Sequence, residues 1–215
     1  MKKAISLVLI SLFFSFGAFA QLTHTANGST VDENANKILN SVAVKWTTGS
    51  FKFDVTVVNL DANKKETFRQ KATITYKAPC YVVKAGDLEI YCDGKTVWQV
   101  NKNVKEVVVN NMTESDDDLT NPAAMLANYQ KNYRAKFIRE EDGTAIIDLQ
   151  PKKSRPYHKI RLFIDTSNNR LKKLEQHNFD SSRGEYTFSN YTLVKVPLTA
   201  FAYTAPEGYE VVDMR

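Results

Sequence analysis

The stretch that decides the fold runs from Thr73 to Val100, TITYKAPCYVVKAGDLEIYCDGKTVWQV. Short runs of β-branched and aromatic residues alternate with polar residues, as in half-buried strands. Pro79, Gly86 and Asp93-Gly94 interrupt these runs at points where turns need such residues. The stretch therefore predicts a strand, a bend marked by proline, a hairpin and a further strand.

The hairpin in this stretch predicts an apolar face. If the hairpin is symmetric about Gly86, Cys80 pairs with Cys92 and Val82 pairs with Ile90. Both pairs then project from the same side of the ribbon, because side chains alternate between faces along a strand. We therefore expect a continuous antiparallel sheet with one apolar face.

Residues 1–20 have the pattern of a secretory signal peptide. Lys2 and Lys3 form the charged start, an apolar run follows, and Ala18-Phe19-Ala20 is a small-x-small cleavage site before Gln21. No cysteine stands at the cleavage point to accept a lipid, so we expect an unanchored periplasmic protein with a single domain over residues 21–215. The formal net charge of +5, two units of which belong to the leader, is too mild to indicate nucleic-acid binding.

The two cysteines leave two alternatives open. In an exported chain, Cys80 and Cys92 opposite each other in a hairpin would form a disulfide. The alternative is a pair of reduced, buried cysteines that act as small hydrophobic residues. Both alternatives give the cysteines a structural role, because the spacing is not that of a redox motif.

Outside the hairpin, the chain predicts a helix followed by an antiparallel meander. The capping box Thr30-x-x-Glu33 opens an amphipathic pattern that ends near Gly49. Including the hairpin, we expect about eleven strands. A single helical turn is also expected at Leu198 to Phe201. The strands outside the hairpin are expected at Phe51 to Val57, Phe68 to Tyr76, Thr96 to Val100, Val104 to Val109, Tyr133 to Arg139, Thr144 to Leu149, Lys159 to Asp165, Arg170 to Phe179, Glu185 to Val196 and Glu210 to Asp213.

One interruption of the meander carries a charge run and a second helix. Met112 to Leu119 contains four acidic residues, which we interpret as a solvated segment, with a calcium site as the functional alternative. Asn121-Pro122 then begins a short helix over Ala123 to Gln130. A sheet with one apolar face is too large for two short helices to cover, so a cavity is expected between them; the alternative is a core filled by the chain's own side chains.

Known catalytic patterns do not occur in the sequence. It contains no G-x-S-x-G, no H-E-x-x-H and no glycine-rich phosphate loop. Glu140-Glu141 is interpreted as a solvated turn, and Asp148 as part of a surface pair. We therefore expect neither an enzyme nor a cofactor or metal.

Three segments together resemble the periplasmic outer-membrane lipoprotein carrier family, the LolA-like proteins. They are Thr75 to Pro79, Asp93 to Trp98, and the terminal Phe201 to Val212 with its Pro-x-Gly-Tyr motif. The resemblance implies an incomplete β-barrel with an α-helical lid. It also implies that the apolar inside receives the acyl chains of a lipoprotein, or another lipid, from an inner-membrane exporter for an outer-membrane acceptor. We expect the carrier to be a monomer.

The sequence departs from that family at one point. Family members carry an arginine that ties the lid to the barrel immediately before the proline, whereas this chain has Ala78 there. Lys77 is predicted to point to the opposite face of the strand, so the lid would be held differently.

The candidate lipid-contacting residues follow from strand parity in the sheet and from the predicted lid. They are Phe53, Val55, Phe68, Ile74, Val82, Ile90, Trp98, Met125 and Leu126. The alternative function, from another class, is an envelope protein that binds or senses a protein partner with the same fold and a filled interior.

Overall fold

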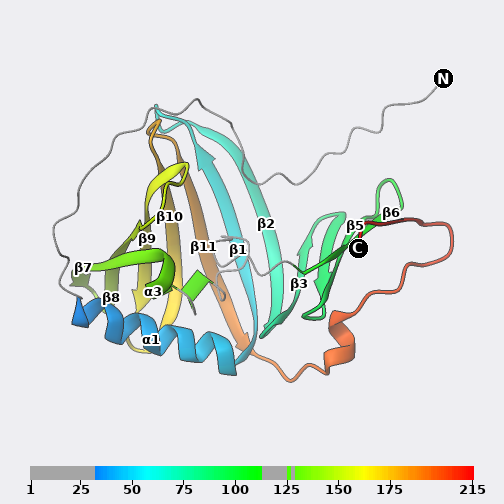
Figure 1. Ribbon diagram of the computed structural model, residues 1–215, viewed down its shortest axis with the longest axis horizontal. Helices are drawn as coiled ribbons and strands as arrows, with labels where there is room; N and C mark the ends of the chain where they lie inside the picture. Colours follow the sequence, from blue (N-terminus) through cyan, green and yellow to red (C-terminus); the bar gives the residue numbers. More distant parts are fainter. Residues whose placement is uncertain (1–31, 113–124, 127–128) are drawn as a thin grey trace. The chain divides into compact units, whose positions relative to one another are not determined.

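The computed structural model describes residues 32–112, 125–126 and 129–215. The predicted signal peptide, the acidic run and half of the predicted helix over Ala123 to Gln130 lie outside these residues. The described residues form one open sheet of twelve strands with a few helices, in the order β12-β6-β5-β4-β3-β2-β1-β11-β10-β9-β8-β7 (Figure 1). This confirms the predicted fold class of a mainly β protein with an incomplete barrel.

The strand bounds follow the predicted meander closely. In chain order, the elements are α1 (Glu33–Thr48), β1 (Ser50–Leu60), β2 (Glu66–Lys77), β3 (Cys80–Ala85), β4 (Leu88–Cys92), β5 (Thr96–Asn101), β6 (Glu106–Asn111), α3 (Tyr129–Asn132), β7 (Tyr133–Glu141), β8 (Thr144–Pro151), β9 (Tyr157–Asp165), β10 (Arg170–Asn178), β11 (Arg183–Leu193), the 3-10 turn η1 (Leu198–Phe201) and β12 (Glu210–Asp213). All neighbouring strands are antiparallel except β12, which runs parallel to β6. Among the described residues, no helix is both long and apolar enough to cross a bilayer.

Helix α1 covers one face of the sheet with an apolar stripe. Ala35, Leu39, Val42 and Trp46 are buried at helical spacing. The N-cap is Asp32, whose side chain accepts a hydrogen bond from the backbone N–H of Ala35, so the predicted capping box at Thr30 is wrong. Asp32 is closer in sequence than Thr30 to Ala35, the first buried residue of the helix, and its side chain accepts a hydrogen bond from an N–H of the first turn.

The face of the sheet against α1 is called the inner face here. The Trp46 ring lies 5.4 Å from the Phe53 ring and 5.3 Å from the Tyr76 ring, measured between centroids. Strand alternation and the observed pairing extend this face across the sheet. Over β8 to β10 the face is tightly filled by the fully buried residues Ile147, Leu149, Ile160, Leu162, Ile164 and Leu171.

The opposite, outer face is also apolar over part of the sheet. Cys80 and Val82 pack with Phe201 of η1, and Val100, Val107 and Val109 pack with tyrosines of the C-terminal segment. The fully buried Phe201 ring fixes this segment against β3. The buried side chains of β3 to β6 therefore lie mostly on the outer face, whereas those on the inner face, apart from Cys92, are partly buried or exposed.

The β3–β4 hairpin differs from its predicted register by one residue. Its turn has two central residues, and Ala85 pairs with Leu88 across it. Gly86 takes the first central position with φ of +63°, a left-handed conformation that favours glycine there. Tyr81 pairs with Cys92 and Val83 with Ile90, so the predicted pairs Cys80–Cys92 and Val82–Ile90 are wrong.

Candidate functional site

Most of the predicted lipid-contacting residues lie on the inner face. The pairing of β1 with β2 places Phe53 opposite Ile74 and Asn59 opposite Phe68, and the pairing of β3 with β4 adds Ile90. With Val55, these make five of the seven candidates from the sheet. Met125 and Leu126, the two candidates from the lid, are fully buried.

Val82 and Trp98 lie on the outer face. Val82 packs with Cys80 and Phe201, and Trp98 packs against the cluster of Val100, Val107 and Val109. The one-residue difference in hairpin register moves every side chain of β3 to the other face, which places Val82 outside. Trp98 pairs with Tyr91 and shares its face.

Sequence parity missed two inner-face residues, Val83 and Val97. Val83 pairs with both Ile74 and Ile90, and Val97 pairs with Cys92. The signal that identifies Val83 is the dipeptide Gly86-Asp87 between two apolar runs, which is typical of a two-residue hairpin loop with glycine first. Val97 shares the face of its partner Cys92 across the β4–β5 turn.

The inner face of β1 to β5 carries no charged side chain. Its polar positions hold only amides and tyrosines, such as Gln70 and Gln99, whereas the charged residues of the same strands, including Lys52, Lys84 and Glu89, alternate to the outer face. This surface suits contact with an apolar chain, because no charge on it would have to lose its water.

The inner face is not uniformly covered. Phe53 is buried by Trp46, Phe188 and Tyr191, with the Tyr191 ring stacked 5.1 Å away. By contrast, Ile74, Val83, Ile90 and Val97 are only partly buried, and Phe68, near the far end of β2, is 38% exposed. The inner face thus has a filled part under α1 and a less covered part over β2 to β5.

Both cysteines are free and buried. Cys80 packs on the outer face with Phe201, whereas Cys92 has its sulfur 3.7 Å from that of Met112. Burial raises the pKa of both thiols. The structure therefore contains the buried thiols of the second alternative in place of the disulfide.

The tie that holds α1 differs from the arginine expected in the family. Lys77 lies on the outer face as predicted, and its ammonium donates to the carbonyl oxygen of Val196 over 3.4 Å. The hydroxyl of Tyr129, at the start of α3, donates to Oδ1 of Asn36 in α1 over 2.6 Å. The phenol is buried, which raises its pKa and keeps it a donor at neutral pH.

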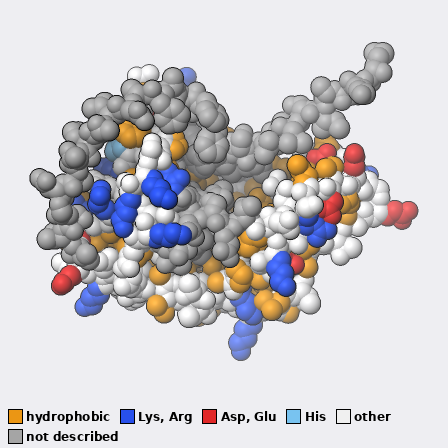
Figure 2. Space-filling model, viewed as in Figure 1, with side chains coloured by type: hydrophobic (Ala, Val, Ile, Leu, Met, Phe, Trp, Pro, Cys, Tyr) orange, Lys and Arg blue, Asp and Glu red, His pale blue; other side chains and the backbone are white. Residues whose placement is uncertain are grey.

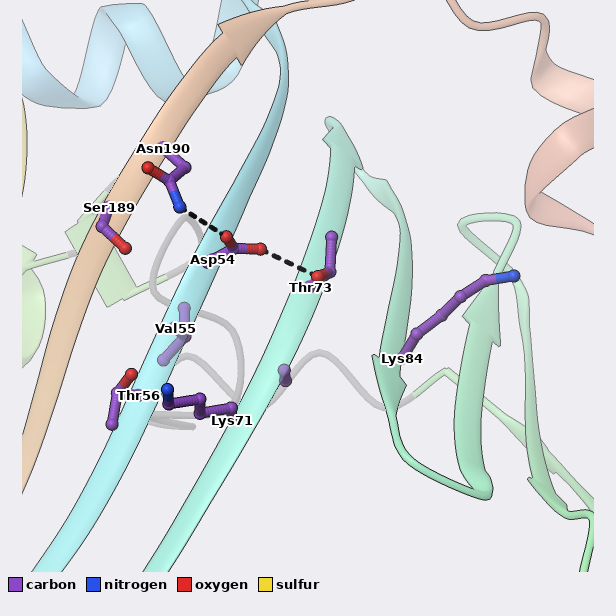
Figure 3. Close-up of a pocket in the computed structure, with 9 residues that line it drawn as sticks. Asp54, Val55, Thr56, Lys71, Thr73, Lys84, Ser189 and Asn190 are labelled. Carbon is purple, nitrogen blue, oxygen red and sulfur yellow. Dashed lines mark hydrogen bonds between the residues drawn. The ribbon is translucent and has the colours of Figure 1, made fainter.

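A polar pocket of about 290 Å³ lies on the outer face between β11, β1, β2 and β3. At its centre, the carboxylate of Asp54 accepts hydrogen bonds from Thr73 and Asn190, at 2.8 and 2.7 Å (Figure 3). These bonds lower the pKa of Asp54. Lys71 and Lys84 also line the pocket. Of the predicted lipid-contacting residues, the pocket includes only Val55, so it is not the apolar cavity expected beneath the lid.

Strands β8 to β11 carry an ion-pair network on the outer face. Asp148 accepts two hydrogen bonds from Arg161, at 2.6 and 2.8 Å, and its side chain is only 10% exposed, so it is not the surface pair that the sequence predicts. Lys159, Lys173, Glu175, Arg183 and Glu185 complete the network. Among the described residues, no group of three or more His, Cys, Asp and Glu could hold a metal ion.

Comparison with known families relates the chain to one family. The model of the family described as outer membrane lipoprotein carrier protein LolA matches residues 83–204. A search of curated proteins found no match.

Solved structures with a similar fold share little sequence. A LolA superfamily protein from Nitrosomonas europaea is 17% identical, with 79% of this chain and 97% of that one covered and a TM-score of 0.44. An uncharacterized conserved protein from Thermus thermophilus is 13% identical, with 84% and 99% covered and a TM-score of 0.57. MucB is also 13% identical, with 81% and 64% covered and a TM-score of 0.51.

Proposed function

Because the chain belongs to the outer membrane lipoprotein carrier family LolA, we propose that it is a carrier that shelters the acyl chains of a lipoprotein, or of a related lipid, on its inner face. The carrier works in the periplasm after its leader is removed. It takes its cargo from an inner-membrane exporter and gives it to an outer-membrane acceptor, with no catalytic step.

The observation that supports this proposal most is the uncharged, partly covered inner face over β2 to β5. Ile74, Val83, Ile90 and Val97 gather there, while the charged side chains of β1 to β5 lie outside. Each methylene of an acyl chain that leaves water for this surface contributes about 0.8 kcal/mol. No catalytic group is needed for such binding.

Entry and release of the cargo are easiest where the inner face is least covered. Helix α1 is held by its buried side chains Ala35, Leu39, Val42 and Trp46 as well as by the hydrogen bond between Tyr129 and Asn36, which alone contributes only about 1 kcal/mol net. The cargo therefore enters and leaves over β2 to β5, where the apolar side chains are only partly buried, while α1 stays in place.

The proposal is tested by binding of a fluorophore that carries an acyl chain. We expect the purified protein to bind it, and Ile74→Asp or Ile90→Asp to abolish binding, because a carboxylate would lose its water on contact with the chain. The matched control is Lys71→Asp, which places the same charge on the outer face of β2 and is expected to bind like the natural protein.

Circular dichroism and thermal unfolding show whether each variant remains folded. Native mass spectrometry of the natural protein gives the second measurement, through co-purified lipid. If neither method detects lipid, or if the folded Ile74 and Ile90 variants bind normally, the carrier proposal is wrong.

The competing proposal is a module that binds a protein partner and has a filled interior. The tightly packed inner face over β8 to β10 favours it. Such a module would form a complex with a protein from the envelope, and neither lipid nor the acyl fluorophore would bind.

A further inference from the structure

A second pocket lies at the end of the sheet where the β1–β2 and β10–β11 turns meet. Its volume is about 360 Å³. The pairing of Leu60 with Arg183 joins the two turns, and the ends of β1, β2 and β11 come together in Figure 1. The pocket lining includes Asp61, Lys64, His158, His177, Phe179 and Arg183.

The lining of this pocket is rich in cationic and hydrogen-bond-donating groups. Among the described residues that line it are Lys64, Arg183 and two imidazoles, with Asp61 as their single carboxylate. Asp61 already accepts hydrogen bonds from the backbone N–H groups of Asn63 and Lys65, both at 2.9 Å. Its carboxylate therefore stabilises its own turn, and its negative charge offsets part of the positive charge of the lining.

The ion-pair network beside the pocket holds Lys159, Arg161, Lys173 and Arg183 against the three carboxylates of Asp148, Glu175 and Glu185. Arg183 belongs to both the network and the pocket, and its guanidinium lies 2.5 Å from the carboxylate of Glu185. Without Arg183 the network is balanced, so the positive charge that an anion would meet comes from Lys64 and from Arg183, the one cation in excess.

An exposed aromatic ring stands at the rim of the pocket. The Phe179 side chain is 72% exposed, and its ring lies 5.7 Å from that of His158. Phe68 is 38% exposed and lies near the same end of the sheet, on the inner face. Exposed aromatic rings beside basic groups are typical of surfaces that enter the interface of a bilayer.

More basic residues follow in the neighbouring loop. Tyr157, at the start of β9, pairs with Asn178, which brings the β8–β9 loop with Lys152, Lys153 and Arg155 to this end of the sheet. Figure 2 shows Lys and Arg side chains gathered over the part of the molecule that contains β7 to β9, and acidic side chains toward the C-terminal end of the sheet. The charge at this end is thus complementary to an anionic surface.

We propose that this pocket binds the phosphate of an anionic phospholipid headgroup and docks this end of the sheet on a membrane surface, with Phe179 entering the interface. Guanidinium, ammonium and imidazole groups all donate hydrogen bonds to phosphate oxygens. The pocket is separate from the acyl-chain surface, so the proposal does not depend on the carrier function.

The test is co-sedimentation of the full chain with vesicles of phosphatidylcholine that contain one-quarter phosphatidylglycerol. We expect the natural protein to bind, Lys64→Asn to lower the partition coefficient about fivefold, and Phe179→Ala to lower it about tenfold. Lys64 has φ of 64°, and asparagine tolerates that left-handed conformation, so the variant keeps its turn.

Matched controls are Lys52→Asn, on the exposed outer face near the other end of β1, and Leu198→Ala, whose side chain is 60% exposed. Both should bind the vesicles like the natural protein, and all four variants should bind the acyl fluorophore normally. High salt should weaken vesicle binding.

Four results would overturn the proposal. The first is no sedimentation of the natural protein with the anionic vesicles, and the second is equal sedimentation of the natural protein and the Lys64 and Phe179 variants. The third is saturation of the pocket by inorganic phosphate, detected by NMR shifts of His158 and His177, without vesicle binding; free phosphate would then be the ligand. A similar loss in the Lys52 control would also contradict a specific site.

Discussion

Asp148 is a buried charge whose ionised state depends on two basic neighbours. Burial by itself raises the pKa of its carboxyl group, but the hydrogen bonds and charge of Arg161, together with the charge of Lys159, outweigh burial and hold the pKa below its ordinary value. Glu175 shows the same balance, with Lys173 as its main partner. Strands β8 and β9 are therefore joined on the outer face by the ion pair of Asp148 and Arg161, in which each charge stabilises the other.

We expect Asp148→Asn to lower the free energy of unfolding by about 3 kcal/mol, because it leaves Arg161 poorly paired in a largely buried position. Urea unfolding measures the change. The control is Asp213→Asn. The Asp213 side chain lies on the exposed strand β12, is 49% exposed and pairs with Arg215. This variant should unfold at the same urea concentration as the natural protein. An unchanged Asp148→Asn variant would contradict the role of the network.

The same charges set the response to acid. A carboxyl group with a lowered folded pKa contributes stability that is present above its unfolded pKa and is lost as the pH falls through its folded pKa. The natural protein should therefore lose stability between about pH 5 and about pH 3, and Asp148→Asn should lose less over that interval. Urea unfolding at a series of pH values measures both slopes, and equal slopes would contradict the assignment to Asp148.

At the scale of an element, one side chain joins α1 to the edge of the sheet. The Oδ1 atom of Asp32 accepts from the N–H of Ala35 at 3.0 Å, and its Oδ2 atom accepts from the N–H of Phe137 in β7 at 2.8 Å. The carboxylate therefore caps the helix and satisfies an edge-strand donor at once. The pKa of Asp32 is lowered, first by the bond from Ala35.

We expect Asp32→Ala to lower the free energy of unfolding by about 2 kcal/mol, since both N–H groups lose their acceptor. Asp32→Asn keeps one carbonyl oxygen, so it retains the helix cap but not the bond to β7. Its free energy of unfolding should lie between those of the natural protein and of Asp32→Ala. Urea unfolding of the three proteins distinguishes these cases. Equal loss in both variants would show that the carboxylate acts through its charge instead.

The sequence predicts the elements better than their register. The alternation in β1 and the turn at Asp142-Gly143 identify their strands well, because local propensity and burial agree there. The β3–β4 hairpin does not reveal its register through alternation, because Val82 and Val83 are both apolar and apolar alternation fits either register. The Gly86 turn then decides the register, and a symmetric assignment about that glycine is one residue off.

At the scale of the whole molecule, the outer cover of β3 to β6 comes from the far end of the chain. Phe201, Tyr203 and Tyr209 follow the last long strand and return across the sheet to pack against these strands. Such contacts between distant segments leave no periodic signal in either segment. Parity alone therefore does not show that Val82 and Trp98 are covered on the outer face, whereas it places Ile74 and Ile90 on the inner face correctly.

This arrangement separates the stability of the outer face from binding on the inner face. Phe201 is fully buried, so we expect Phe201→Ala to lower the free energy of unfolding by about 4 kcal/mol through the cavity that it leaves. Leu198→Ala, in the same turn but exposed, should change it by less than about 0.5 kcal/mol. Because Phe201 lies outside the sheet, the folded fraction of its variant should bind the acyl fluorophore with unchanged affinity. A loss of affinity measured below the unfolding transition would show instead that the outer segment and the inner face are coupled, and that the C-terminal cover takes part in holding the cargo.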